Sequence, residues 1–190
     1  CCKKSSVNLY ARKSLLRPVL IRAYLITGAP GTGKTSLLRE AIATFRGKAG
    51  GFYTQEIRIR GVREGFLLTT MAGEQATLAH ISLSGPPRVG KYGVDIASLE
   101  RVGIAALRKA LAQDDLVVVD EIGKMELFSG AFREAVTEAL SGEKRVLGTI
   151  MLNPHPWADN VKSMPQVRLW LLNKSNRQQV KEEIMSWLES

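Results

Sequence analysis

The chain has 190 residues, a hydrophobic content of 45% and a formal net charge of +9. This length fits a single α/β domain, and the apolar content is sufficient for a packed core. No apolar run approaches the ~20 residues that a membrane span requires, so the sequence predicts no membrane-spanning helix.

Residues 1–22 differ in charge from the rest of the chain. They contain six basic and no acidic residues, and so account for six of the nine net positive charges. We assign 1–22 as a basic N-terminal extension, disordered or outside the core, and 23–190 as one domain. A tail that contacts a membrane or nucleic acid stays open, although nucleic-acid binding by the fold itself is only weakly supported. Cys1 and Cys2 form no disulfide framework, which favours a cytoplasmic location.

The most specific motif follows an apolar, β-branched run at 19–27 that predicts a buried strand. It is the octapeptide Gly28-Ala29-Pro30-Gly31-Thr32-Gly33-Lys34-Thr35, which fits the phosphate-binding loop G-x-x-x-x-G-K-[ST]. Apolar residues at helical spacing over 35–45 place the bound anion at a helix N-terminus. We expect Lys34 to contact the β- and γ-phosphates and Thr35 to bind Mg²⁺.

The next segment predicts antiparallel hairpins. After a break at 48–51, strand-like runs occupy 52–60, 65–71 and 75–81, with turns between them. This pattern is typical of a meander inserted into, or extending, a parallel sheet. Four arginines lie in or just beyond this region: Arg58, Arg60, Arg63 and Arg88. One of them could reach the γ-phosphate as an arginine finger, and we expect most of them to be solvated surface charges.

A second half of the site is predicted at the end of a buried strand. A helix over 95–113 leads to the apolar run Leu116-Val117-Val118-Val119, and Asp120 and Glu121 follow directly. Ligands bind outside the carboxyl ends of parallel strands. We therefore expect Asp120 to bind Mg²⁺, directly or through water, and Glu121 to activate the attacking water. Val117, Val118 and Val119 belong to the candidate nucleotide-binding segment.

The remaining elements complete an alternating pattern. A helix is predicted over 129–140, a strand over 145–150, a loop over 153–165, a strand over 167–172 and a helix over 178–188. If the 145–150 strand lies between the first strand and the Asp120 strand, Thr149 emerges near the γ-phosphate; a backbone-bonded strand residue is the alternative. Trp157 either stacks on a base or packs in the core. Strands that alternate with helices predict a parallel, wound sheet.

Several segments, in order, resemble the family of thermostable and cancer-related nucleoside-triphosphatases. The longest is Val117-Val118-Val119-Asp120-Glu121-Ile122-Gly123-Lys124-Met125-Glu126-Leu127, and it is more specific than a strand followed by an acid. Further resemblances occur at 51–56, 89–95, 147–150 and 176–177. The likeness runs from about residue 23 to the C-terminus.

The resemblance implies a three-layer P-loop NTPase fold and slow, Mg²⁺-dependent hydrolysis of nucleoside triphosphates with broad base tolerance. On that basis Lys34, Thr35, Asp120 and Glu121 keep the roles given above. Arg177 is a further candidate for contact with the base or a phosphate, or else part of a surface pair that starts a helix. Ser36 stands where the family commonly has threonine, and its hydroxyl suits the α-phosphate.

We expect hydrolysis of ATP, GTP and possibly CTP and UTP at the γ-phosphate, because Glu121 beside Asp120 provides a base for water. Two alternatives stay open at this stage. One is a nucleotide or small-molecule kinase, which needs an acceptor pocket. The other is a nucleotide-controlled switch associated with RNA or DNA. The sequence fixes neither the preferred base nor the oligomeric state.

Overall fold

The computed structural model describes residues 20–190, so most of the predicted N-terminal extension lies outside the described residues. Two residues that we assigned to the extension are attached to the domain. The carbonyl of Ile21 accepts a hydrogen bond from Trp187 Nε1 at 3.2 Å. The Arg22 N–H donates to the carbonyl of Gln166 at 3.0 Å. The domain therefore begins slightly before residue 23.

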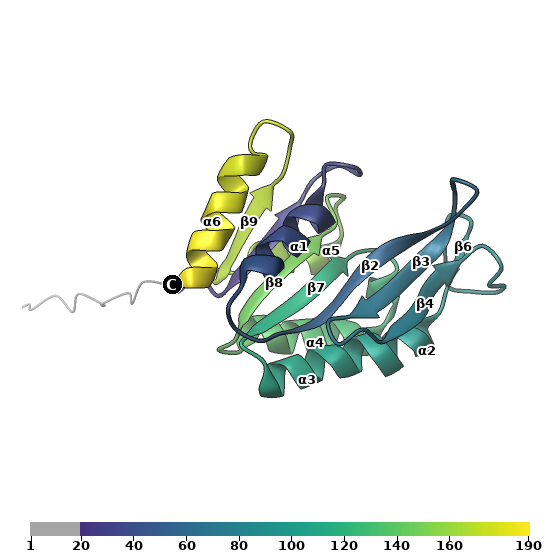
Figure 1. Cartoon of the computed structure of the whole chain (residues 1–190). Helices are drawn as coiled ribbons and strands as arrows, with labels where there is room; N and C mark the ends of the chain where they lie inside the picture. The colour runs from purple at the N-terminus through teal and green to yellow at the C-terminus, as the bar shows by residue number, and fades with distance from the viewer. Residues whose placement is uncertain (1–19) are drawn as a thin grey trace, which may run out of the picture.

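The described strands form one nine-stranded sheet, which has a parallel half and an antiparallel half (Figure 1). Their order is β5-β6-β4-β3-β2-β7-β8-β1-β9. Strands β2, β7, β8, β1 and β9 are parallel, and the hairpins continue the sheet from β2, which confirms the predicted antiparallel region. The strands are β1 (Ala23–Thr27), β2 (Ala49–Ile59), β3 (Val62–Thr70), β4 (Gln75–His80), β5 (Arg88–Val89), β6 (Tyr92–Val94), β7 (Leu116–Ile122), β8 (Arg145–Ile150) and β9 (Val167–Leu171).

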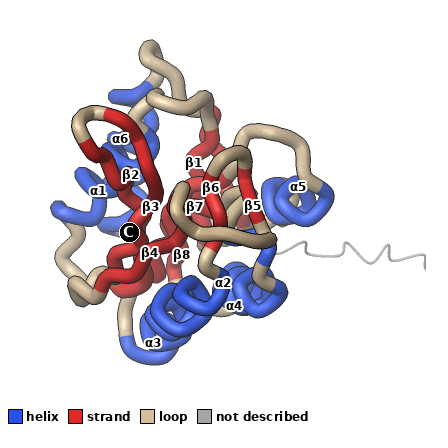
Figure 2. The backbone as a smooth tube through the Cα atoms, turned by 90° about the vertical axis from the view of Figure 1, so that its right-hand side faces the viewer, coloured by secondary structure: helices blue, strands red, loops and turns tan. Residues whose placement is uncertain are grey.

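Helices cover both faces of the parallel half, so the molecule has the three layers that the sequence predicts (Figures 1 and 2). α1 (Lys34–Thr44) and α6 (Arg177–Glu189) enclose one apolar cluster against the sheet. A larger cluster fills the other side. The elements there include α2 (Ile96–Ser98), the π-helical segment η1 (Leu99–Ile104), α3 (Ala105–Gln113), the 3-10 segment η2 (Glu126–Phe128), α4 (Gly130–Ser141) and α5 (Pro156–Lys162). No helix of the described residues is long and apolar enough to cross a membrane.

The predicted break at 48–51 is wrong, because β2 begins at Ala49 and includes both glycines. Gly51 lies opposite Val118 in the parallel pairing of β2 with β7. Its φ is +107°, and a Cβ there would lie 2.0 Å from the Val118 carbonyl oxygen. The glycine is therefore required by the close approach of β7, and it is not a sign that the strand ends.

The predicted loop over 153–165 is also wrong, because it contains α5. Pro156 occupies the first turn of this helix, where its missing N–H costs nothing. The His155 side chain caps the helix by accepting a hydrogen bond from the Ala158 N–H at 3.4 Å. Trp157 is half-buried and packs against the larger core cluster, as the packing alternative predicted.

The glycine in β2 generates a test of stability. We expect Gly51→Ala to lower the free energy of unfolding by about 3 kcal/mol or more, because it adds a clash with the β7 backbone to the conformational cost. Gly73 is a matched control: its φ is +92°, but a Cβ there would meet no other atom within 4 Å. Gly73→Ala should cost only about 1–2 kcal/mol. Urea unfolding measures both, and equal losses would contradict this account of Gly51.

Candidate active site

Three strands bring the candidate residues to one edge of the sheet. β8 lies between β1 and β7, which is the condition on which the placement of Thr149 depended, so the carboxyl ends of all three strands are neighbours. The phosphate loop follows β1, Asp120 lies near the end of β7, and Thr149 lies near the end of β8. The sheet topology therefore gathers residues that lie far apart in the chain.

The phosphate loop folds around the side chain of Lys34. Gly31 and Gly33 have φ values of +77° and +86°, which favour glycine. A Cβ on Gly28 would lie 2.6 Å from the carbonyl oxygen of Leu172. The Lys34 ammonium donates to the carbonyls of Gly28 and Ala29, at 3.0 and 3.3 Å. The loop thus holds a positive charge at its centre.

The start of α1 is suited to an anion. Gly33 is the N-cap residue and provides no side-chain hydrogen bond, and the first turn contains no acidic residue. The N-terminal N–H groups of a helix lack intrahelical partners and carry partial positive charge. Together with Lys34 they provide the electrostatic environment that a triphosphate needs.

Asp120 is a buried carboxyl group in contact with the next strand. Only 1% of its surface is exposed, and its Oδ1 accepts a hydrogen bond from the Thr149 hydroxyl at 2.5 Å. Burial raises the pKa of Asp120, while Thr149, the Thr35 hydroxyl and the Lys34 ammonium favour its charged form. Thr149 therefore bonds to the acid at the end of the neighbouring strand, and not to the backbone as the alternative had it.

These residues fit a magnesium ion. Asp120 Oδ2 is buried and has no hydrogen-bond partner among the described residues, and the Thr35 hydroxyl is close enough to favour the charged carboxylate. Hard oxygen atoms from one carboxylate and one hydroxyl, completed by phosphate oxygens and water, are the donor set that Mg²⁺ prefers.

Glu121 follows Asp120 and is half-buried. Burial raises the pKa of Glu121, and the negative charge of Asp120 raises it further, whereas Lys34 lowers it. A carboxylate with a raised pKa is a stronger proton acceptor once it is ionised. Burial and the charge of Asp120 thus give Glu121 the raised proton affinity that a general base needs.

The structure also contains an acid that we did not single out from the sequence. Glu126 lies in η2 and is 4% exposed, and its Oε2 accepts a hydrogen bond from the Gly123 N–H at 3.1 Å. Its motif was visible in the sequence, but a charged residue in a short turn carries no periodic signal of burial. Three acids, Asp120, Glu121 and Glu126, thus gather after the hydrophobic part of β7.

Other predicted residues have a different environment. Val117, Val118 and Val119 are fully buried in the core clusters and belong to the strand that presents Asp120, so their place in the nucleotide-binding segment stays a prediction. Arg177 begins α6 and donates to the Gly33 carbonyl at 3.0 Å and to Glu40 at 2.6 Å. It contacts the phosphate loop itself, an arrangement that neither of our alternatives described.

The candidate arginine fingers are mostly engaged elsewhere. Arg58 and Arg63 both bond to Glu56, and Arg88 bonds to the carbonyls of Leu83 and Lys91. These partners all belong to the hairpin region. Arg60 is exposed at the β2–β3 turn, with a φ of +49°. The hydrogen bonds of Arg58, Arg63 and Arg88 therefore hold these side chains in the hairpin region and not at the phosphate loop.

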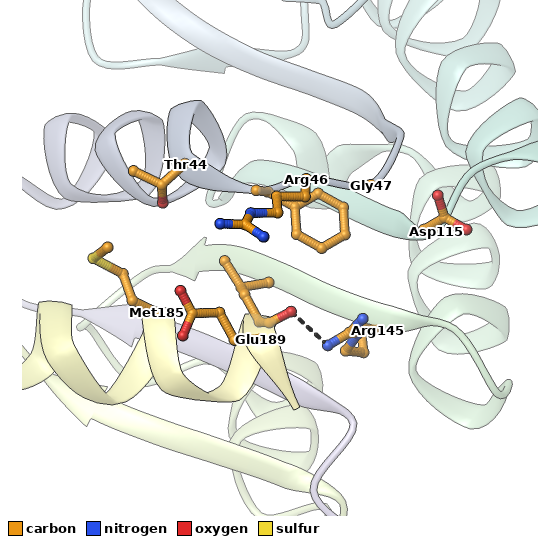
Figure 3. Close-up of a pocket in the computed structure, with 9 residues that line it drawn as sticks. Thr44, Arg46, Gly47, Asp115, Arg145, Met185 and Glu189 are labelled. Carbon is orange, nitrogen blue, oxygen red and sulfur yellow. Dashed lines mark hydrogen bonds between the residues drawn. The ribbon is translucent and has the colours of Figure 1, made fainter.

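A large cavity of about 520 Å³ lies away from these residues (Figure 3). It is lined by the ends of α1 and α6, including Phe45 and Met185, and by Arg145 at the start of β8. The Arg145 guanidinium donates to the Leu188 carbonyl at 2.9 Å. Because the phosphate loop lies at the opposite ends of α1 and the parallel strands, this cavity is not the candidate active site.

The wound parallel sheet, the loop between β1 and α1 and the acid at the end of β7 define a P-loop NTPase fold. A family model described as "NTPase" matches residues 23–185, and the chain belongs to this nucleoside-triphosphatase family. The family resemblance inferred from the motifs is therefore confirmed.

Individual relatives match over most of their length. The chain is 43% identical to nucleoside-triphosphatase THEP1 of Thermotoga sp. (strain RQ2) over 165 residues, which are 87% of this chain and 94% of that protein. It is 34% identical to the cancer-related nucleoside-triphosphatase of Homo sapiens over 187 residues, 90% of this chain and 98% of that one. The crystal structure of THEP1 from the hyperthermophile Aquifex aeolicus superimposes with a TM-score of 0.81 at 32% identity, covering 88% and 99% of the two chains.

The contact between Thr149 and Asp120 yields a second test. We expect Thr149→Val to lower the free energy of unfolding at pH 7 by about 1–3 kcal/mol, because it leaves a buried carboxylate oxygen unpaired. Thr149→Ser keeps the hydroxyl and loses one buried methyl group, which costs about 1 kcal/mol. Urea unfolding at pH 7 compares the two. A valine variant as stable as the parent would show that the hydrogen bond is not needed.

Proposed function

We propose that this protein is a Mg²⁺-dependent phosphatase that hydrolyses the γ-phosphate of nucleoside triphosphates to yield the diphosphate and phosphate. The observation that supports it most is the position of Glu121, a carboxyl group of raised pKa beside Asp120 at the edge of the sheet where the phosphate loop begins. The names of its relatives, which are nucleoside-triphosphatases, support the same activity.

In this proposal the phosphate loop binds and orients the substrate. The backbone N–H groups of 31–36 and the Lys34 ammonium contact the β- and γ-phosphates, and the Ser36 hydroxyl lies near the α-phosphate. Thr35 and Asp120 would hold Mg²⁺, which neutralises charge on the phosphate oxygens. Lys34 also stabilises the charge that develops on the leaving diphosphate.

Glu121 activates the water. Its carboxylate accepts a proton from the water as the oxygen attacks the γ-phosphorus, and the bond from phosphorus to the β–γ bridging oxygen breaks. The electron pair of that bond leaves with the diphosphate. Glu121 is partly buried, so bulk water forms fewer hydrogen bonds with its carboxylate. This favours proton transfer from the attacking water to Glu121.

We infer broad base tolerance, with ATP, GTP, CTP and UTP as substrates. The support is that the phosphate loop recognises the triphosphate through backbone groups and Lys34, and that Trp157, the one aromatic candidate for base stacking, packs against the core. Arg58 and Arg63 of the hairpin region form ion pairs with Glu56. This pairing gives no support to an arginine-rich lid of the kind that a kinase uses. A cytoplasmic location stays a prediction.

The direct test of this proposal is phosphate release from the four triphosphates, with and without Mg²⁺. We expect release from all four, with rates that differ by about tenfold or less, because the loop recognises the triphosphate and not the base; tenfold corresponds to about 1.4 kcal/mol. Chelation of Mg²⁺ should abolish release. Transfer of the labelled γ-phosphate of ATP to an added acceptor, in place of release to water, would show a kinase.

Glu121→Gln should separate binding from chemistry. We expect the affinity for the Mg²⁺–triphosphate complex to change little, because glutamine keeps the size of the side chain. The turnover number should fall by about 10²–10⁴-fold through loss of the base. Nucleotide binding by fluorescence titration and single-turnover phosphate release measure the two effects. A variant that turns over as fast as the parent excludes Glu121 as the base.

Lys34→Ala is the contrasting variant. Because Lys34 lies at the centre of the loop, its removal should weaken binding as well as slow the reaction. Unchanged affinity in the same titration would argue against the assignment of the loop.

A further inference from the structure

Glu126 is a buried carboxyl group that the proposed reaction does not use. The chain folds back after β7, with the Leu127 N–H donating to the Gly123 carbonyl and the Ser129 N–H donating to the Glu126 carbonyl, both at 3.0 Å. The Glu126 side chain closes this turn from inside through its bond to the Gly123 N–H. Burial of a carboxyl group costs free energy, and an apolar side chain of similar size would fill the same space without that cost.

Gly123 lies between the two glutamates. A Cβ at Gly123 would lie 3.1 Å from Glu126 Oε2 and 3.3 Å from Glu121 Oε1. The carboxyl groups of Glu121 and Glu126 therefore both lie close to Gly123. Glu121 is the candidate base, and Glu126 is the buried acid that the proposed reaction does not use. The hydrogen bond to the Gly123 N–H comes from Glu126.

The charges around Glu126 disfavour a second ionised acid. From β7 it faces Glu121 and Asp120, and among the ion pairs of the described residues none includes Glu126. Glu100 of η1 is bonded to the Ser129 hydroxyl at 2.7 Å, and Lys34 acts on Glu121 and Asp120. Burial first, and the charge of Glu121 second, raise the pKa of Glu126 to about 8.

We propose that Glu126 is a positioning residue for Glu121, whose carboxyl group braces the Gly123 turn in its neutral form and releases it when charged. This inference rests on the proposed role of Glu121 as the base. Near neutral pH the turn is closed and Glu121 points to the water. At higher pH the ionised Glu126 must gain access to water, because a buried unpaired charge is costly, and the turn that holds Glu121 opens.

The test is the pH dependence of kcat and KM from pH 6 to 10 for the parent and Glu126→Gln. Glutamine is neutral at every pH, has the same size, and its carbonyl oxygen still accepts the Gly123 N–H. We expect the parent kcat to fall above about pH 8, approaching tenfold per pH unit, with KM little changed. The variant should keep at least about a third of the parent kcat at pH 7 and show no such fall.

Glu100→Gln is the matched control, because Glu100 is a nearby exposed acid that accepts the Ser129 hydroxyl and, among the described residues, has no hydrogen bond to Gly123. It should keep the parent profile. A fall that persists in Glu126→Gln, a parent profile that is flat to pH 10, or loss of the fall in Glu100→Gln would each overturn the proposal. A parent without any phosphate release would instead overturn the proposed function.

Stability provides a readout that does not depend on turnover. The pKa of Glu126 in the folded protein lies above its ordinary value of 4.5, so the parent loses stability as pH rises from about 4.5 to 8. Glu126→Gln lacks this loss. The melting temperature of Glu126→Gln minus that of the parent should therefore be larger at pH 9 than at pH 5. A difference that is the same at both pH values would contradict a buried neutral Glu126.

Discussion

The candidate site depends on a carboxyl group that the fold withdraws from water. Asp120 is almost fully buried between strands, and one of its oxygens is bonded to Thr149 while the other has no protein partner among the described residues. Such a group is costly unless a cation balances its charge. The positive groups at the start of α1 and the Lys34 ammonium supply part of that balance. The strand order β7-β8-β1 brings these opposite charges together.

The residues that could be predicted from the sequence are those whose chemistry demands a fixed spacing. The phosphate loop requires glycines and a lysine between a strand and a helix, and the acid must follow a buried strand. The place of Thr149 followed from one topological assumption, that β8 lies between β1 and β7. The roles of these residues stay proposals, but their convergence at one edge of the sheet was predictable because parallel strands end on the same side.

What could not be predicted was decided by contacts between distant segments. Gly51 signals a break in isolation, and only the nearness of Val118 explains a glycine inside β2. Pro156 suggests a loop until it is seen to occupy the first turn of α5. Glu126 has the character of a surface residue, and its burial follows from the 3-10 turn that folds it back over Gly123. No local pattern carries these facts.

The bond between Arg177 and the Gly33 carbonyl joins residues 144 positions apart, and Glu40 is held by both Arg177 and Lys181. β1 likewise has only β8 and β9 as neighbours in the sheet, and both are synthesised long after it. The end of the sheet that carries the phosphate loop is therefore incomplete in a nascent chain until the ribosome has released almost the entire polypeptide. Truncated translation products would have the loop sequence without a working phosphate site.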